Sequence, residues 1–365
     1  MSKNATLKAV RNLEKAQALL DRAKPQDALL ALGHGAPRAL AGEHAFLAAE
    51  CLRSMGSLGN CGTWYEAALS LTKRSSDPER WLEACLGLVS ALRSLGECPK
   101  ARRLLAQGLA LAEKEGLLDL AERCRLESVL LDRAEGLYPA SIRALTAFLK
   151  LFRKRKDPAA MAFVLWALGG ARRFSGDLEG SLKDYRQSRL LALMAKDPTG
   201  AGYAMLGLGG IERIKGDLSK ALAWYQESRK VFAKTQDLFA QAYAECGQGN
   251  CLRQLGRLKE AGRRYAASHQ LYSKINDPVD LAYVDWGLGK IAMAEGRLQD
   301  ADSRMKLALD GFSRFNEHRG MVLSLMALAS VRHAMGRTAE AEKLFDQGLC
   351  LARKTGLHAH LEIYT

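Results

Sequence analysis

Apolar residues recur along this chain at helical spacing, in segments separated by turn signals about every 20 residues. The first signal is a glycine that returns every 40 residues without insertion or deletion. It stands at Gly56, Gly96, Gly136, Gly176, Gly216, Gly256, Gly296 and Gly336. No segment alternates as a β-strand would. The pattern therefore predicts an all-α chain of helical hairpins, each with a first helix (helix A) and a second helix (helix B).

The two turn signals suit two different kinds of helix end. A glycine after helix A supplies the left-handed residue that commonly follows a helix C-terminus. The second signal, on the same 40-residue period, consists of Asp77, Asp157, Asp197, Asp237 and Asp277, with Gly116 and Glu317 in the gaps. Proline follows four of these aspartates, and it suits the first turn of a new helix while ending the previous one. We therefore expect the acidic turns to separate one hairpin from the next.

Within the hairpins the chain resembles the tetratricopeptide repeat, which has Leu-Gly in helix A and a small-aromatic-small pattern in helix B. The matching residues are Leu168-Gly169, Ser181, Tyr185 and Ser188 in one unit, and Leu208-Gly209, Ala221, Tyr225 and Ser228 in the next. The 40-residue length is similar to that of Pins-type scaffolds and kinesin light chains. The resemblance implies a right-handed superhelix (an α-α solenoid) whose A helices line a concave groove, where ligands usually lie.

The period divides the chain into three parts. Residues 1–40 are expected to form an incomplete capping pair of helices, and residues 357–365 a C-terminal stub. Between them lie eight predicted repeats, at 41–80, 81–120, 121–160, 161–200, 201–240, 241–280, 281–320 and 321–356.

Four positions of each A helix, at 13, 10, 6 and 3 residues before the repeat glycine, fall on one helical face. By the family resemblance this is the groove face. Arginine stands three residues before the glycine in six consecutive units, at Arg53, Arg93, Arg133, Arg173, Arg213 and Arg253. Thirteen residues before the glycine stand the aromatic residues Phe163, Tyr203, Tyr243 and Tyr283, and ten residues before it stand Trp166 and Trp286. The remaining position holds Gly170, Gly210, Asn250 and Lys290.

This stripe predicts a ligand surface in the middle and later units. Arginine forms bidentate bonds with carboxylates or phosphates and stacks on rings, which suits an acidic peptide with apolar anchors. It also suits single-stranded RNA, whose bases stack on aromatic rings. Two structural alternatives stay open. The arginines would complement the helix dipole or bond acids such as Glu212 and Asp217, and the rings would pack between units.

The charge adds a second functional class. The chain has 54 lysines and arginines against 40 acidic residues, a net charge of +14 that favours acidic partners, nucleic acid or anionic surfaces. We predict a protein-interaction scaffold or adaptor that binds an acidic, helical or extended segment of a partner protein. The alternatives are an RNA- or single-strand-binding protein and a module that senses a peptide or metabolite.

Several kinds of chemistry have no signal in the sequence. The eight cysteines lack paired CxxC spacing, so we expect small apolar packing residues and neither a zinc site nor disulfides. Gly207-Leu-Gly209-Gly210 lacks the strand and the spacing of a phosphate loop. We expect no enzyme, cofactor or metal. Without a signal peptide or transmembrane segment, we expect a soluble cytoplasmic protein with no membrane partner, in an oligomeric state that the sequence leaves open.

Overall fold

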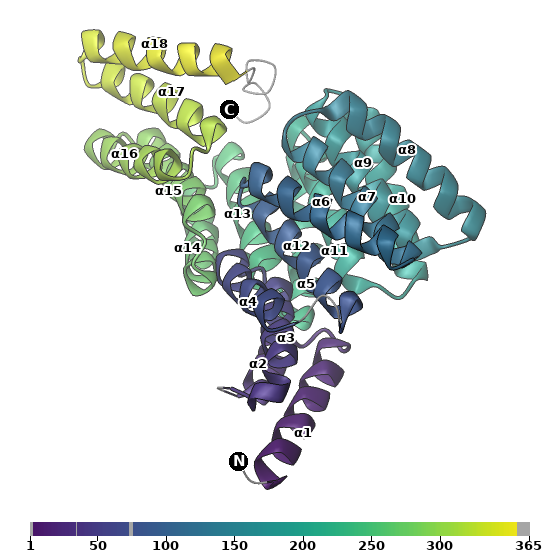
Figure 1. Ribbon diagram of the computed structural model, residues 1–365. Helices are drawn as coiled ribbons and strands as arrows, with labels where there is room; N and C mark the ends of the chain where they lie inside the picture. The colour runs from purple at the N-terminus through teal and green to yellow at the C-terminus, as the bar shows by residue number, and fades with distance from the viewer. Residues whose placement is uncertain (1–2, 34, 73–75, 356–365) are drawn as a thin grey trace. The chain divides into compact units, whose positions relative to one another are not determined.

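The computed structural model describes residues 3–33, 35–72 and 76–355, and these residues form helices and no strand (Figure 1). A short 3-10 helix, η1 (Arg38–Leu40), precedes α3. The α-helices are α1 (Lys3–Leu20), α2 (Pro25–Leu32), α3 (Ala41–Ser54), α4 (Leu58–Leu71), α5 (Pro78–Ser94), α6 (Cys98–Lys114), α7 (Leu118–Ala134), α8 (Tyr138–Arg155), α9 (Pro158–Phe174), α10 (Leu178–Met194), α11 (Pro198–Ile214), α12 (Leu218–Thr235), α13 (Leu238–Gln254), α14 (Leu258–Ile275), α15 (Pro278–Ala294), α16 (Leu298–Arg314), α17 (His318–Ala334) and α18 (Thr338–Thr355). The predicted all-α chain of consecutive hairpins is confirmed.

Odd-numbered helices from α3 onward are the A helices, and even-numbered ones from α4 onward are the B helices. The two helices of a hairpin pack together, as α3 with α4 and α9 with α10 in unit 1, and α15 with α16 and α17 with α18 in unit 2. The B helix of one hairpin also packs on the next A helix, as α4 does on α5. Neighbouring A helices also contact one another, as α5 does α7 in unit 1 and α15 does α17 in unit 2.

Both turn signals have the predicted conformations. All eight repeat glycines have φ between +75° and +90°, the left-handed region that an L side chain disfavours. The aspartates cap the following A helix, as where Asp157 Oδ1 accepts a hydrogen bond from the Ala160 amide at 2.9 Å. The residue before the acidic turn is also left-handed, for example Lys156 with φ +56° and Asn276 with φ +54°. Gly116, with φ +68°, is the glycine at this second left-handed position.

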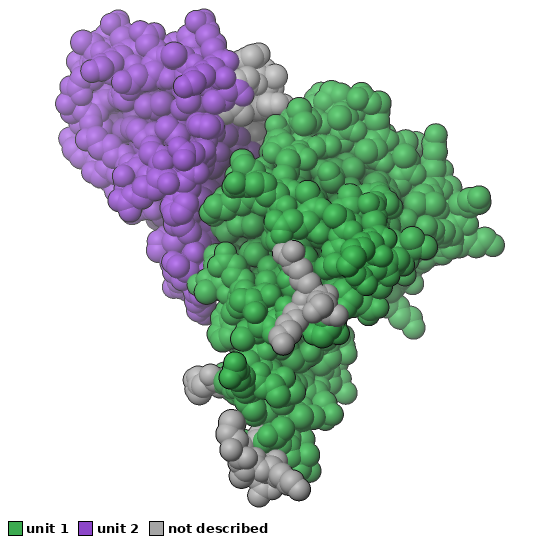
Figure 2. Space-filling view, in the orientation of Figure 1, with its two compact units in different colours: residues 1–207, 230–240 green, residues 208–229, 241–365 purple. Residues whose placement is uncertain are grey.

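The chain forms two compact units (Figure 2). Unit 1 comprises Met1–Gly207 and Lys230–Ala240, and unit 2 comprises Leu208–Arg229 and Gln241–Thr365. The predicted cap helices α1 and α2 belong to unit 1, where α2 packs on α3. The division into eight repeats stays a prediction, and the expected stub at 357–365 lies outside the described residues.

Two further expectations concern side-chain character. Six of the eight cysteines are buried, as small apolar packing residues would be: Cys51, Cys61, Cys85, Cys98, Cys124 and Cys251. Within the described ranges, none of the helices combines the length and the apolar character needed to cross a membrane.

Unit 1 contains one long-range connection, which we call the clasp. The Met55 carbonyl accepts hydrogen bonds from the Leu238 and Phe239 amides, both at 3.2 Å. The side chain of Gln236 accepts from the Gln26 amide at 3.0 Å and donates to Asp27 Oδ2 at 3.3 Å. These contacts join the turn before α13 to α2 and to the α3–α4 turn, across 209 and 210 residues of sequence for the two side-chain bonds.

Gly56 makes the clasp a close fit. A β-carbon added there would fall less than 3.0 Å from Cβ of Phe239. The other seven repeat glycines have no such neighbour within 4 Å. Gly56 therefore meets two requirements, a left-handed turn and room for Phe239.

Candidate ligand-binding face of the A helices

Four tyrosines in B helices set how closely successive A helices approach. Tyr65, Tyr185, Tyr225 and Tyr265 are at most 4 % exposed. Each ring lies against a glycine of the next A helix, where an added β-carbon would be closer than 3.0 Å to the ring. These glycines are, in the same order, Gly87, Gly207, Gly247 and Gly287. The tyrosine pockets therefore hold the A helices in register.

In other hairpins the tyrosine and the glycine are both replaced. The equivalent pairs are Leu105 and Glu127, Leu145 and Ala167, and Met305 and Ala327. The glycine-rich segment that begins at Gly207 lies inside α11, as expected, and receives the ring of Tyr185. Gly207 and Gly209 are explained by packing against the rings of Tyr185 and Tyr225.

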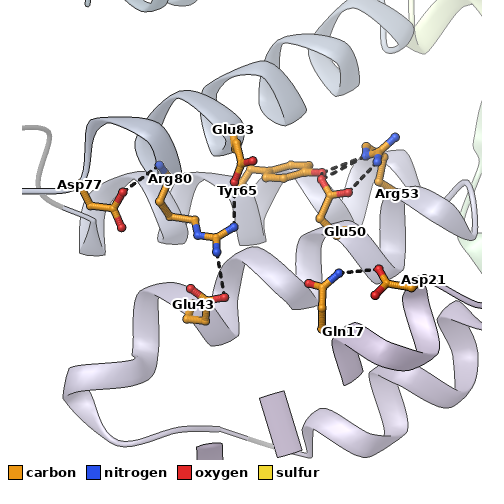
Figure 3. Close-up of polar contacts among 9 residues, drawn as sticks. All are labelled: Gln17, Asp21, Glu43, Glu50, Arg53, Tyr65, Asp77, Arg80 and Glu83. Atoms are coloured by element: carbon orange, nitrogen blue, oxygen red, sulfur yellow. Dashed lines mark hydrogen bonds and ion pairs between the residues drawn. The ribbon is translucent and has the colours of Figure 1, made fainter. Parts of the chain in front are cut away.

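The first arginine of the series is bound within its own hairpin (Figure 3). Arg53 donates from Nε to the Tyr65 hydroxyl at 3.0 Å and from Nη2 to Glu50 Oε2 at 2.6 Å. The Tyr65 hydroxyl also donates to Glu50. This closed network gives Arg53 a structural role, and Glu50, six residues before the glycine, belongs to the same stripe.

Positions 13 residues before the glycine connect neighbouring hairpins. In the first two repeats, Arg80 forms ion pairs with Glu43 at 3.1 Å and with Glu83 at 2.8 Å (Figure 3). In a later repeat, the Tyr203 hydroxyl donates a hydrogen bond to Asp237 Oδ2 at 2.8 Å. These contacts match the packing alternative for this column.

The same column continues in unit 2. The Tyr283 hydroxyl donates a hydrogen bond to Glu317, the N-cap of α17, and accepts a hydrogen bond from Arg319 Nε at 2.9 Å. Its ring packs edge-on against Phe312, with centroids 4.5 Å apart. Tyr243, the member between these two tyrosines, is half-buried.

Arg133 is the arginine of unit 1 whose charge is least balanced. Its guanidinium lies over the Trp166 ring, 5.1 Å from the centroid, and Nη1 donates weakly to the Ala167 carbonyl at 3.5 Å. In the part of the chain that the structure describes, no carboxylate pairs with it. The nearby Glu127 is engaged by Arg93, whose Nε is 2.6 Å from Glu127 Oε1.

Burial and then the charge of Arg93 lower the pKa of Arg133 to about 10. Gly170 makes room for this group, because a β-carbon there would lie 2.8 Å from Nη1 of Arg133. The result is a desolvated cation on the A-helix face that an anion would stabilise.

The Trp166 ring that contacts this cation belongs to a cluster of aromatic side chains. The Trp166 ring lies 5.8 Å from Phe163 and 6.1 Å from Tyr203 between centroids. Tyr203 packs on Phe232 at 5.1 Å. Phe163 is 43 % exposed, which makes it the accessible apolar surface of the cluster.

Two arginines of the series, Arg173 and Arg213, come between Arg133 and Arg253 in the sequence. Arg173 lies over the Phe174 ring, 4.6 Å from the centroid. For Arg213, burial acts to lower the pKa, but Tyr225 and Tyr243 act against it and the pKa is raised. Both side chains are half-buried.

Unit 2 carries a second cation-tryptophan cluster. The Arg253 guanidinium carbon and the Lys290 ammonium each lie 5.7 Å from the Trp286 ring centroid. Trp286 is 6 % exposed and donates from Nε1 to the Leu323 carbonyl at 3.3 Å. Asn250 accepts from the Tyr265 hydroxyl at 2.9 Å, so its side chain is held beside Arg253 in the same A helix.

The two clusters are equivalent by sequence. Arg133 and Trp166 recur 120 residues later as Arg253 and Trp286. They differ six residues before the glycine, where unit 1 has Gly170 and unit 2 has Lys290.

The sequence pattern identified the arginines but not the carboxylates that bind Arg53 and Arg93. Glu50 stands in the same column as Gly170, and following that column back to the first unit would have found it. Glu127 stands nine residues before its glycine, outside the stripe, and the sequence gives no signal that it binds Arg93.

Comparisons with known proteins agree with the hairpin architecture. The profile of the tetratricopeptide repeat matches residues 324–358, and no curated protein sequence matches the chain. A Rap protein complexed with Competence and Sporulation Factor has a TM-score of 0.66 at 9 % identity, over 95 % of this chain and 98 % of that one. Aspartyl phosphate phosphatase F from Bacillus subtilis gives 0.58 at 9 % identity, over 97 % and 95 %.

A signal transduction ATPase with a tetratricopeptide repeat sensor, from Pyrococcus horikoshii, gives 0.57 at 13 % identity, over 100 % of this chain and 56 % of that one. At these identities the likeness concerns the fold. Hairpins, left-handed glycine turns and the matching last hairpin together give this chain the architecture of a tetratricopeptide-type solenoid.

Proposed function

We propose that the chain is a protein-interaction module that holds an acidic segment of a partner on its A-helix face. In this proposal Arg133 and Trp166 form the principal anchor of unit 1. Arg173 lies in another A helix of unit 1, and Arg213 and Arg253 lie in A helices of unit 2. The fold supports the proposal in general terms, because a solved protein of this fold, the Rap protein, holds Competence and Sporulation Factor.

The observation that carries the proposal is the unbalanced charge of Arg133. Burying a cation without a partner is unfavourable, and adding an anion with good geometry recovers much of that free energy. Arg53 and Arg93 already hold carboxylates of the chain, at 2.6 Å each, whereas Arg133 holds a weakly bonded carbonyl and a ring. A carboxylate from a partner would accept hydrogen bonds from the N–H groups of the Arg133 guanidinium.

The aromatic cluster supplies the apolar half of the site. A residue next to the partner's carboxylate would lie on Phe163, which is 43 % exposed. The Trp166 ring is already in contact range of Arg133 and Tyr203, so little side-chain freedom is lost on binding. The site therefore suits an acidic residue flanked by a large apolar one.

The test uses decapeptides selected from a random phage-displayed library on the full chain and measured by calorimetry. Arg133→Met should weaken binding of the selected acidic peptides by about tenfold or more, the value of a charge-assisted hydrogen bond. The matched control is Arg143→Met, which removes the same charge from an exposed position on helix B of the same hairpin. Equal losses in the two variants, or selected peptides without acidic residues, would contradict the proposal.

The net charge of +14 keeps single-stranded nucleic acid as a second candidate. Nucleic-acid binding would show a steep fall in affinity with salt, because each phosphate contact releases counterions. A random RNA 20-mer that binds more tightly than the selected peptides at 150 mM salt, with the same dependence on Arg133, would favour this candidate over the protein partner.

A further inference from the structure

The cluster in unit 2 differs from its counterpart in unit 1 by one positive charge. Both clusters have an arginine near a tryptophan ring, at 5.1 Å for Arg133 and 5.7 Å for Arg253. Unit 2 adds Lys290, whose ammonium is also 5.7 Å from the ring of Trp286. At the equivalent position unit 1 has Gly170.

Neither cation of the unit 2 cluster is neutralised. Among the described residues, Arg253 and Lys290 form no ion pair, and Nε of Arg253 is buried with no hydrogen-bond partner there. Burial and then the charge of Arg253 lower the pKa of Lys290, so the two cations repel each other in a poorly solvated place. A ligand with two negative charges would relieve this repulsion, whereas a single charge would leave one cation unbalanced.

The geometry of the cluster favours a compact anion. Trp286 is fixed by its hydrogen bond to the Leu323 carbonyl at 3.3 Å, so it forms a rigid wall. Arg253 offers a planar fork of donors, and Lys290 offers an ammonium on a flexible stem that can turn toward the same anion. Asn250 has its carbonyl oxygen occupied by Tyr265, while its amide nitrogen has a long contact to Cys246 Sγ at 3.8 Å.

We infer that Arg253, Lys290 and Trp286 form a binding site for a compact dianion, a phosphate monoester or a pair of adjacent carboxylates, carried by the partner's segment. The inference rests on the proposed function, because it takes the dianion to be part of the partner's segment. A phosphorylated side chain carries close to two charges at neutral pH. A nucleic-acid backbone is a diester with one charge per phosphate, and the site discriminates against it.

The test follows the tryptophan itself. The full chain is labelled with 5-fluorotryptophan, and the five fluorine signals are assigned with single Trp→Phe variants. Phenyl phosphate, phenylmalonate and the diester methyl phenyl phosphate are titrated at pH 7.5 and constant ionic strength. The Trp286 signal should report dissociation constants at least about tenfold lower for the dianions than for the diester. The ratio of the two dianions then distinguishes phosphate from paired carboxylates.

The variants use the internal equivalence of the two clusters. Lys290→Met should abolish the preference for dianions, while Lys259→Met, at an exposed position on α14, should keep it. At Trp166, where unit 1 has Gly170 in place of Lys290, the wild-type chain should show no such preference. Equal affinities for phenyl phosphate and its diester in the wild-type chain, or an unchanged ratio in Lys290→Met, would overturn the inference.

The two proposals fail separately. If the dianion preference at Trp286 is missing but acidic peptides still depend on Arg133, the inference is overturned and the proposed function stands. If Trp286 prefers dianions but no acidic peptide depends on Arg133, the dianion site stands and the anchor of the proposed function is wrong.

Discussion

Replacing Gly287 with alanine should destabilise the chain, although alanine is the better helix former. Gly287 lies in α15, and an added β-carbon would fall 2.6 Å from Cζ of Tyr265 and 2.7 Å from Cε1. The ring has no free space to retreat, because Tyr265 is 0 % exposed. Forcing an extra methyl group into such a packed place costs about 1–3 kcal/mol. The gain from alanine's helix propensity is about 1 kcal/mol.

The chain offers a matched control in the same unit. Gly262 lies in α14, and a β-carbon added there meets no atom within 4 Å. Gly262→Ala should therefore show the propensity gain alone. Subtracting the two free energies of unfolding cancels that gain, and Gly287→Ala should be less stable than Gly262→Ala by about 1–3 kcal/mol.

Urea unfolding followed by circular dichroism at 222 nm measures the difference, with the slope m checked for each variant. A double variant tests the cause. Leucine is the residue that the chain itself places at position 145, where the facing position is Ala167. In the Tyr265→Leu background the cost of Gly287→Ala should therefore become small. The reasoning is refuted if Gly287→Ala is as stable as Gly262→Ala, or if the two changes in the double variant are additive.

Two further predictions concern unit 1. Gly56→Ala and Gly96→Ala introduce the same left-handed strain, with φ +79° and +77°, but only Gly56 faces Phe239. Hydrogen exchange at the Leu238 and Phe239 amides should therefore accelerate in Gly56→Ala and stay slow in Gly96→Ala; equal rates would contradict the clasp. Burial raises the pKa of Asp237 from 3.8 to about 6, so its contribution to stability is complete below pH about 4 and is lost as the pH rises through about 6. Asp237→Asn keeps the cap and should flatten the profile of urea midpoints over that range; an unchanged profile would count against this assignment.

The helices could be predicted from the sequence because every boundary is a local event. A left-handed glycine such as Gly216 and a capping acid such as Asp157 act on their immediate neighbours, so their period is visible along the chain. The tyrosine pockets were not predicted, although the sequence contains a signal for them. The paired change of Tyr185 and Gly207 to Leu145 and Ala167 is present in the sequence once two columns are compared.

The state of each arginine could not be predicted in this way. Arg93 and Arg133 share a column, yet one binds Glu127 and the other lies on Trp166. The difference depends on which residue of the neighbouring hairpin reaches the guanidinium, and the period contains no such information. The clasp could not be predicted either, because nothing in the sequence near Met55 indicates a contact with Phe239.

In a repeat protein, contacts between neighbouring hairpins allow each hairpin to fold soon after it is synthesised. The clasp cannot form as early as these local contacts, because Gln26 and Gln236 are 210 residues apart in the sequence. At translation rates of about 5–20 residues per second, this separation corresponds to on the order of ten to forty seconds. During this interval the Met55 carbonyl and the turn at Gly56 remain open to water and to any chaperone near the ribosome. The beginning of the chain is therefore made early and completed late.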